Sequence, residues 1–294
     1  MPELPDIAVY LDCLRPRVLG RRLDRITFRN PFVLRSVTPA PAELTGALVT
    51  ELRRLGKRIV LALEGERFIV IHLMIAGRLR WHEADGRTPG KAALALFEFG
   101  SGTLVLTEAG STRRASVHLV GSEAGLGAFD RGGLEVLDQD GGAFADRLLS
   151  ENHTLKRALT DPRLFSGIGN AYSDEILHRA RLSPLTLTRK LASEDIQRLY
   201  EAARLTLAEW TVRLRAEVGE GFPDKVTAFR EGMAVHGRYG QPCPECGAAV
   251  QRIRYAANET NYCARCQTGG RLLADRAMSR ILREDWPRSL DELE

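Results

Sequence analysis

Residues 243–266 read CPECGAAVQRIRYAANETNYCARC and decide the fold of the C-terminal part of the chain. This stretch holds four of the five cysteines, arranged as two CxxC pairs with sixteen residues between them: Cys243, Cys246, Cys263 and Cys266. Four thiolates at this spacing are the ligand set of a closed, tetrahedral zinc site. Apolar residues at 250, 253 and 255 are interspersed with polar residues at 251, 252 and 254, roughly as in a β-hairpin, so we expect one between the two pairs. We therefore expect a small hairpin held by one structural Zn²⁺, with a rubredoxin-like iron as the alternative metal.

Composition describes an ordinary globular chain of 294 residues, with 44% hydrophobic and 27% charged residues. No apolar run approaches the roughly 20 residues needed to cross a bilayer, and the first residues form no signal peptide. We therefore expect a cytoplasmic protein without membrane association, in which paired cysteines bind metal rather than form disulfides. The net charge of +4, carried mostly by arginine, is compatible with a polyanionic partner such as nucleic acid. The remaining cysteine, Cys13, is expected to be a buried small hydrophobic residue.

The N-terminal part changes from a helical to a strand pattern after about 20 residues. The first 19 residues predict a short opening loop and then a helix, from apolar residues at helical spacing: Ile7, Tyr10, Leu11 and Leu14. Residues 58–63, 68–71 and 103–106 are short, rich in β-branched and aromatic residues, and separated by turns that contain glycine. This pattern predicts an antiparallel β-sandwich with a flanking helix, forming an N-terminal domain over residues 2–135.

The second half of the chain has a helical pattern up to the cysteine stretch. Residues 143–218 predict a helical domain, with one helix beginning at Ser193, where an N-cap residue and two acids precede an apolar repeat. Residues 219–238 are rich in glycine and predict a flexible loop, and the hairpin module occupies 239–267. The tail, 268–294, predicts one more amphipathic helix, through Leu273, Ala277, Ile281 and Leu282. The expected fold class is therefore multidomain α+β.

The chain starts Met1-Pro2-Glu3. Initiator methionine is generally removed before a small residue, which would leave Pro2 with a free secondary amine. An α-amino group titrates near pH 7.7–8.0, so a useful fraction is unprotonated and nucleophilic at neutral pH. Glu3 is suitably placed in the sequence to move protons beside it. Most prolines at this position have no catalytic role, so these residues alone leave that interpretation open.

The stretch 166–172, SGIGNAY, joins two helical segments. Its glycines permit a tight turn before a helix, where main-chain N–H groups and the amide of Asn170 form a suitable phosphate site. An ordinary turn between helices explains the same residues. Glu175, which follows, is expected to be a surface or packing carboxylate rather than a catalyst.

Seven short motifs, in this order, resemble the formamidopyrimidine-DNA glycosylase and endonuclease VIII family over about residues 2–267. They are Pro2-Glu3-Leu4-Pro5-Asp6, Arg54-Leu55-Gly56-Lys57-Arg58, His72-Leu73, Thr112-Arg113-Arg114, Gly167-Ile168-Gly169-Asn170, Gly237-Arg238-Tyr239-Gly240-Gln241-Pro242-Cys243 and Tyr262-Cys263-Ala264-Arg265-Cys266-Gln267. The resemblance implies an N-terminal β-sandwich, a helix-two-turn-helix domain and a C-terminal zinc hairpin. It also implies a bifunctional DNA glycosylase and abasic-site lyase, which we expect to act as a monomer on damaged double-stranded DNA.

The same resemblance implies roles for individual residues. Pro2 would attack C1′ of a nucleotide whose base is flipped out, Glu3 would transfer protons, and Lys57 would hold a backbone phosphate and assist. The resulting imine would drive β- and δ-elimination, which nicks the strand. Contacts to DNA are expected from five further residues: Asn170, Lys156, Arg113, Asn258 and His72.

Three positions depart from the family pattern. Asn258 stands where the family presents an arginine, and an amide cannot supply the charge-assisted fork of a guanidinium. Ile75, beside Met74, and Ala115 stand where the family has a methionine and a phenylalanine that fill the gap left by the flipped base. We therefore expect looser phosphate binding and an altered choice of lesion.

Two other interpretations remain at this stage. A non-catalytic protein that binds damaged or structured DNA could use the same scaffold, and the altered positions favour it. A zinc-ribbon adaptor for nucleic acid, unrelated to the family, would require the N-terminal match to be a coincidence.

Overall fold

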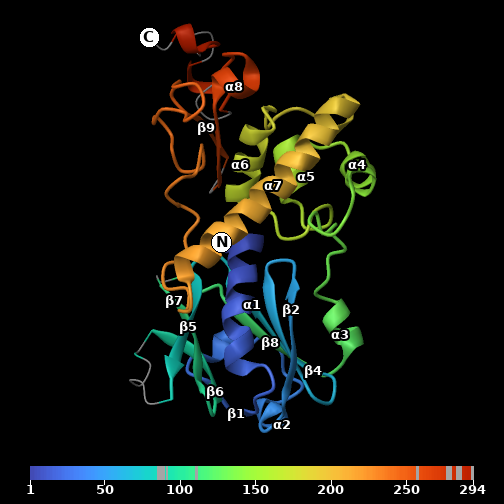
Figure 1. Ribbon diagram of the computed structural model, residues 1–294, viewed down its shortest axis with the longest axis vertical. Coiled ribbons are helices and arrows are strands. Elements are labelled where there is room, and N and C mark those ends of the chain that lie inside the picture. The colour runs from blue at the N-terminus through green and yellow to red at the C-terminus, as the bar shows by residue number, and fades with distance from the viewer. Residues whose placement is uncertain are drawn as a thin grey trace. The chain divides into compact units, whose positions relative to one another are not determined.

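The computed structural model describes residues 1–84, 90, 92–109, 112–255, 258–275, 280–282 and 287–292. The chain forms two compact units (Figure 1). The N-terminal unit comprises Met1–Arg131 and Trp210–Thr227, and the C-terminal unit comprises Gly132–Glu209 and Ala228–Glu294. Within the described ranges, no helix is both long and apolar enough to span a bilayer.

The N-terminal unit contains helix α1 (Leu4–Val18) and two four-stranded antiparallel sheets. The first sheet has the order β1 (Leu23–Phe28), β6 (Ala93–Phe99), β7 (Gly102–Glu108) and β5 (Gly77–Glu83). The second has the order β2 (Val49–Leu55), β3 (Arg58–Leu63), β4 (Arg67–His72) and β8 (Ser116–Val120). Two short helices, η1 (Pro31–Val33) and α2 (Pro41–Leu44), lie between β1 and β2, and a third, α3 (Glu123–Gly127), follows β8. The predicted antiparallel β-sandwich with a flanking helix is confirmed.

Side chains from the helix and from both sheets share one hydrophobic core. Ile7 and Leu14 of α1, Ile59 of the second sheet and Phe97 of the first all belong to it and are fully buried. Successive strand residues point to opposite faces, so the inner faces of both sheets supply this core. Ala115 is also part of it, at 3% exposure.

Helix α7 (Ser193–Val218) belongs to the C-terminal unit up to Glu209 and to the N-terminal unit from Trp210 onward. The segment that follows it packs on the N-terminal unit as well. The ring of Phe222 lies 5.8 Å from that of Tyr10, and Val226 is part of the core. The glycine-rich stretch predicted as one loop is therefore divided between the two units, at Thr227.

The C-terminal unit contains helices α4 (Gly141–Leu149), α5 (Leu155–Thr160), η2 (Thr188–Lys190) and α6 (Asn170–Arg179), with the first part of α7. Phe144 of α4 is fully buried, with its ring 4.8 Å from Phe165 and 5.5 Å from Tyr200. Strands β9 (Gln251–Tyr255) and β10 (Asn258–Tyr262) form an antiparallel hairpin that leads into α8 (Ala264–Thr268). The predicted helical domain and C-terminal hairpin are thus confirmed.

The tail after α8 packs on the hairpin. Leu272 and Leu273 share a small apolar cluster with Tyr262, and the N–H of Leu273 donates to the Tyr262 hydroxyl at 2.8 Å. Leu273 lies in an irregular segment, residues 280–282 are helical, and η4 spans Leu290–Glu292. Ala277, which the predicted tail helix includes, lies outside the described residues.

Candidate functional site

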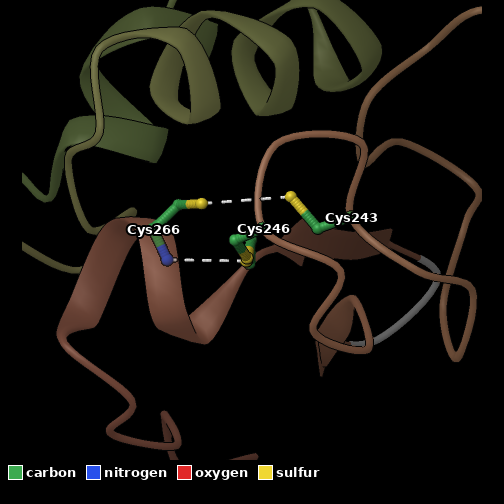
Figure 2. A group of neighbouring side chains, drawn as sticks. Cys243, Cys246 and Cys266 are labelled. Carbon is green, nitrogen blue, oxygen red and sulfur yellow. Dashed lines mark hydrogen bonds between the residues drawn. The ribbon is translucent and has the colours of Figure 1, made fainter.

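The four predicted metal ligands come together. Their sulfur atoms all lie within 4.8 Å of one another, with Cys243 and Cys266 separated by 3.9 Å and Cys246 and Cys263 by 3.4 Å. Figure 2 shows that Cys243 and Cys246 lie on the loop before the hairpin, opposite Cys266 on α8. Tetrahedral zinc with bonds of about 2.3 Å places its sulfurs about 3.8 Å apart, so the cluster fits one structural Zn²⁺.

A histidine contacts one of these ligands. His178, near the C-terminal end of α6, is 5% exposed, and its Nε2 lies 3.3 Å from Cys243 Sγ. Burial lowers the pKa of His178, which favours the neutral ring. With zinc bound, the Cys243 thiolate would only accept hydrogen bonds, and Nε2 of His178 would carry the proton in this contact. This contact orients Cys243 and joins the metal site to the helical part of the C-terminal unit.

The N-terminal end of α1 lies in a partly buried, charged environment. Glu3 is 3% exposed, and its main-chain N–H donates to Asp6 Oδ2 at 2.8 Å, which closes the first turn of the helix. Burial lowers the pKa of the Met1 α-amine, Glu3 opposes this shift, and the cations of Arg78 and Lys57 add to it. Glu3 and Lys57, both predicted from sequence, thus act on the amine that precedes Pro2. Arg78 was missed because no motif contains it.

Lys57 lies at the tip of the turn between β2 and β3. Leu55 and Arg58 are directly paired, so Gly56 and Lys57 make a two-residue turn. Gly56 has a φ of +62°, in the left-handed region that favours glycine, which explains the Gly-Lys sequence at this point. The turn presents Lys57 at the end of the second sheet.

His72 ends β4 and is the cross-strand partner of Arg58. Burial, the cations of Arg58 and Lys57, and neighbouring His118 lower the pKa of His72 to about 4. The ring is therefore neutral at pH 7, when one nitrogen can donate a hydrogen bond and the other can accept one.

The positions expected near a flipped base differ in exposure. Ile75 is 57% exposed, and Met74 before it adopts a φ of +54°, which is unusual for a side chain of this kind. Arg113 is exposed in the segment before β8. Ala115 is buried, and its main-chain N–H donates to Glu108 Oε2 at 2.9 Å.

Asn170 and Lys156 meet in the C-terminal unit, at the beginning of α6. Asn170 Nδ2 donates to the main-chain oxygen of Glu259 in β10 at 2.9 Å. Lys156 Nζ donates to the main-chain oxygen of Asn170 at 2.7 Å and to Asp174 Oδ1 at 2.5 Å. An amide NH₂ and an ammonium carry two and three donors respectively, so each is partly engaged within the fold.

Sequence reasoning missed a buried polar network around Asp174, whose side chain is 0% exposed. Besides Lys156, Asp174 accepts from His236 Nδ1 at 2.7 Å and from the main-chain N–H of Asn261 at 3.2 Å. It thereby ties α5 and α6 to the segment before the first cysteine pair and to the hairpin. The only signal in the sequence was a pair of acids, Asp174 and Glu175, directly after the Gly-Asn turn.

Glu175 is a packing carboxylate, as one of the two sequence interpretations had it. It is buried and accepts three main-chain N–H groups, from Ala234, Val235 and His236, at 2.7–2.9 Å. Burial raises the pKa of Glu175, against the effect of these three donors. Asn258 begins β10 opposite Tyr255, and its side chain lies outside the described residues.

A two-sheet unit joined to a helical unit with a four-cysteine hairpin defines a zinc-containing helix-two-turn-helix protein. Residues 1–113 match the formamidopyrimidine-DNA glycosylase N-terminal domain, residues 134–217 match the H2TH domain of the same glycosylase, and residues 240–269 match the zinc finger found in FPG and IleRS. The chain belongs to the formamidopyrimidine-DNA glycosylase family.

Relatives and solved structures agree with this assignment. The chain is 34% identical to the formamidopyrimidine-DNA glycosylase of Heliobacterium modesticaldum and 36% identical to that of Thermus thermophilus, covering 91% and 92% of this chain and 100% of each relative. The crystal structure of the Thermus thermophilus protein superposes with a TM-score of 0.74 at 33% identity, covering 90% of this chain and 98% of that one. A Lactococcus lactis Fpg mutant, in complex with Fapy-dG containing DNA, shares the fold at 24% identity and a TM-score of 0.78. The match covers 91% of this chain and 100% of that one.

Proposed function

We propose that this protein is a bifunctional DNA glycosylase and abasic-site lyase that acts as a monomer on damaged double-stranded DNA. Its substrate is an oxidised or ring-opened base. Membership of the glycosylase family supports this proposal, and one local observation carries it. Burial and the cations of Arg78 and Lys57 lower the pKa of the Met1 α-amine, one residue before Pro2, whereas Glu3 raises it. A lowered pKa leaves an amine unprotonated and nucleophilic at neutral pH, and we expect the same influences on the Pro2 amine once Met1 is removed.

In the proposed reaction, removal of Met1 frees the secondary amine of Pro2. The Pro2 nitrogen bonds to C1′ of the flipped-out nucleotide while the bond from C1′ to the base breaks. The base leaves with the bonding electron pair and takes up the proton that the Pro2 nitrogen loses. Glu3 gives a proton to the ring oxygen O4′, so the sugar opens and an iminium forms between C1′ and Pro2.

The iminium then acts as an electron sink for strand cleavage. Loss of a proton from C2′ expels the phosphate on the 3′ side, and a second elimination expels the phosphate on the 5′ side. Hydrolysis of the remaining imine frees Pro2 for another turnover. Lys57 at the tip of its turn holds the phosphate next to the lesion, where its charge stabilises the negative charge on the departing oxygen.

Further residues bind the DNA in this proposal. Asn170 and Lys156 hold the backbone near the lesion through the donors that the fold leaves to them, and Arg113 and neutral His72 contact the strand from the N-terminal unit. Asn258 donates only a neutral hydrogen bond. Exposed Ile75 occupies the space vacated by the flipped base, since a half-exposed apolar side chain on a strained turn gains by entering the base stack.

A non-catalytic DNA-binding protein is the second candidate, and the burial of Ala115 favours it. The family phenylalanine at that position is replaced by a methyl group inside the core, which cannot insert between bases.

The test compares duplexes carrying an oxidised purine, a ring-opened purine, an oxidised pyrimidine or an abasic site. We expect release of at least one damaged base, and strand nicks that carry phosphate at both new ends. A variant with one extra residue retained before Pro2 should bind the same duplexes and leave them intact. Tight binding by the unmodified chain without any base release or nick would support the second candidate and refute the first.

A further inference from the structure

Two arginines on the zinc hairpin share one counter-ion. Arg252 and Arg254 are two residues apart on β9, so both side chains lie on the same face of the hairpin. Glu259 on β10 is the direct cross-strand partner of Arg254. Its Oε2 lies 3.3 Å from Arg252 Nη1 and 3.5 Å from Arg254 Nε. A single carboxylate oxygen therefore serves two guanidinium groups.

The arginine pair is also oriented by an aromatic ring. The guanidinium carbon of Arg252 lies 3.9 Å from the centre of the Tyr239 ring, which is 50% exposed. Such stacking fixes the plane of a guanidinium while leaving its N–H edge available to an acceptor. The Arg254 side chain is 62% exposed. Tyr239, Arg252 and Arg254 thus form a cationic strip on the hairpin, which we call the arginine strip.

Glu259 links the arginine strip to the beginning of α6 through hydrogen bonds. Its Oε1 accepts from Asn261 Nδ2 at 2.9 Å, and Asn261 is 2% exposed. The main-chain oxygen of Glu259 accepts from Asn170 Nδ2 at 2.9 Å. The same residue therefore places the arginine strip next to Asn170, within the C-terminal unit.

We propose that Arg252 and Arg254 form a phosphate-binding subsite whose ligand is the phosphodiester backbone of DNA, and that phosphate displaces Glu259 from them. This inference rests on the proposed function, since it takes DNA as the ligand. Each guanidinium carries five N–H donors, which a shared carboxylate oxygen at 3.3–3.5 Å satisfies poorly. A phosphate presents several oxygens and matches the fork of each guanidinium. The subsite supplies the charged contact that Asn258 cannot.

The experiment measures binding of the full-length, zinc-loaded chain to a fluorescent duplex that contains tetrahydrofuran, an uncleavable abasic-site analogue, over a series of KCl concentrations. Each lost phosphate contact reduces the slope of log K against log salt by about 0.9. We expect a reduction of about one for Arg252→Gln and for Arg254→Gln, and about two for the double variant. The lysine variants at both positions keep the charge and should largely keep the slope.

Two further variants sharpen the comparison. Arg198→Gln is the matched control, because Arg198 is also a half-exposed arginine with one carboxylate partner, Asp195, and lies on α7. Its slope should equal that of the unmodified chain. Glu259→Gln removes the competing counter-ion and should tighten binding roughly two- to fivefold at low salt.

Unchanged salt slopes in Arg252→Gln and Arg254→Gln, with zinc content and circular dichroism intact, would overturn the subsite. The absence of any DNA binding by the unmodified chain would overturn it as well. This outcome is separate from a failure of the proposed function. Loss of base release and nicking in the unmodified chain, with the salt slopes behaving as stated, would refute the glycosylase and leave the subsite standing.

Discussion

The buried ion pair between Lys156 and Asp174 gives the most quantitative prediction. Lys156 is 13% exposed and Asp174 is 0% exposed, and their N–O distance is 2.5 Å. Removing one member of such a pair lowers the free energy of unfolding by about 3–5 kcal/mol, because a buried charge is left without its partner. Asp174 accepts from three donors, and in Asp174→Asn the new amide N–H₂ group faces at least one of them donor to donor. This clash should lower the free energy of unfolding by about a further 1–3 kcal/mol. The sum approaches the entire stability of many domains, about 5–15 kcal/mol.

Lys156→Met is the complementary change. It leaves the Asp174 carboxylate with His236 and the N–H of Asn261 as donors, so we expect a loss of about 3 kcal/mol. In the double variant no buried charge remains unpaired, since an amide faces a thioether. The double variant should therefore lose about 2–3 kcal/mol less than the sum of the two single losses.

The assay is urea unfolding of the four proteins at saturating zinc, followed by far-ultraviolet circular dichroism. Asp161 and Arg163 provide the matched control, because this pair lies in the same unit with the arginine side chain 57% exposed. When Asp161 and Arg163 are replaced singly and together in the same way, their coupling free energy should stay below about 1 kcal/mol. If the double variant's loss of stability equals the sum of the two single losses to within about 0.5 kcal/mol, Lys156 and Asp174 are not coupled and the reasoning fails.

Three other predictions concern the metal, the pH and the proton donor. Cys263→Ser, or removal of zinc by a chelator, should unfold the hairpin and abolish DNA binding, as read from zinc content and a binding titration; a metal-free chain that binds normally would contradict this. His72 has a pKa of about 4 in the folded chain, below its ordinary 6.5, so protonation favours the unfolded state. Stability should be unaffected above pH 6.5 and fall by on the order of 3 kcal/mol as the pH drops to about 4, and a His72→Asn variant that loses stability equally steeply over this range would refute the assignment. Glu3→Gln should lose base excision and keep abasic-site cleavage, and normal excision by this variant would remove Glu3 from the mechanism.

Local patterns predicted most of the architecture. The cysteine spacing, the alternation along the strands and the apolar repeat of α7 are each visible within a few residues, because hydrogen bonding and burial impose short periods on the sequence. The family resemblance then indicated which parts of the site to expect, including Glu3 and Lys57 near the N-terminal amine.

The missed features depend on contacts between distant residues. Asp174 joins Lys156, His236 and Asn261, which are separated from it by 18 to 87 positions along the chain, and no short pattern marks such a set. The sharing of Glu259 between two arginines likewise requires the register of the hairpin. The apolar repeat of α7 continues without a break through Glu209, so it gives no sign that the helix serves both units.

The central claim is that the N-terminal proline bonds covalently to the sugar. We would incubate the chain with an abasic-site duplex, reduce the mixture with borohydride, digest it with trypsin and locate the DNA adduct by mass spectrometry. The account predicts a single adduct on the peptide that begins at Pro2, with Met1 absent and the modification on the proline nitrogen. An adduct on Lys57 or another lysine, or no adduct while the strand is still cleaved, would contradict it.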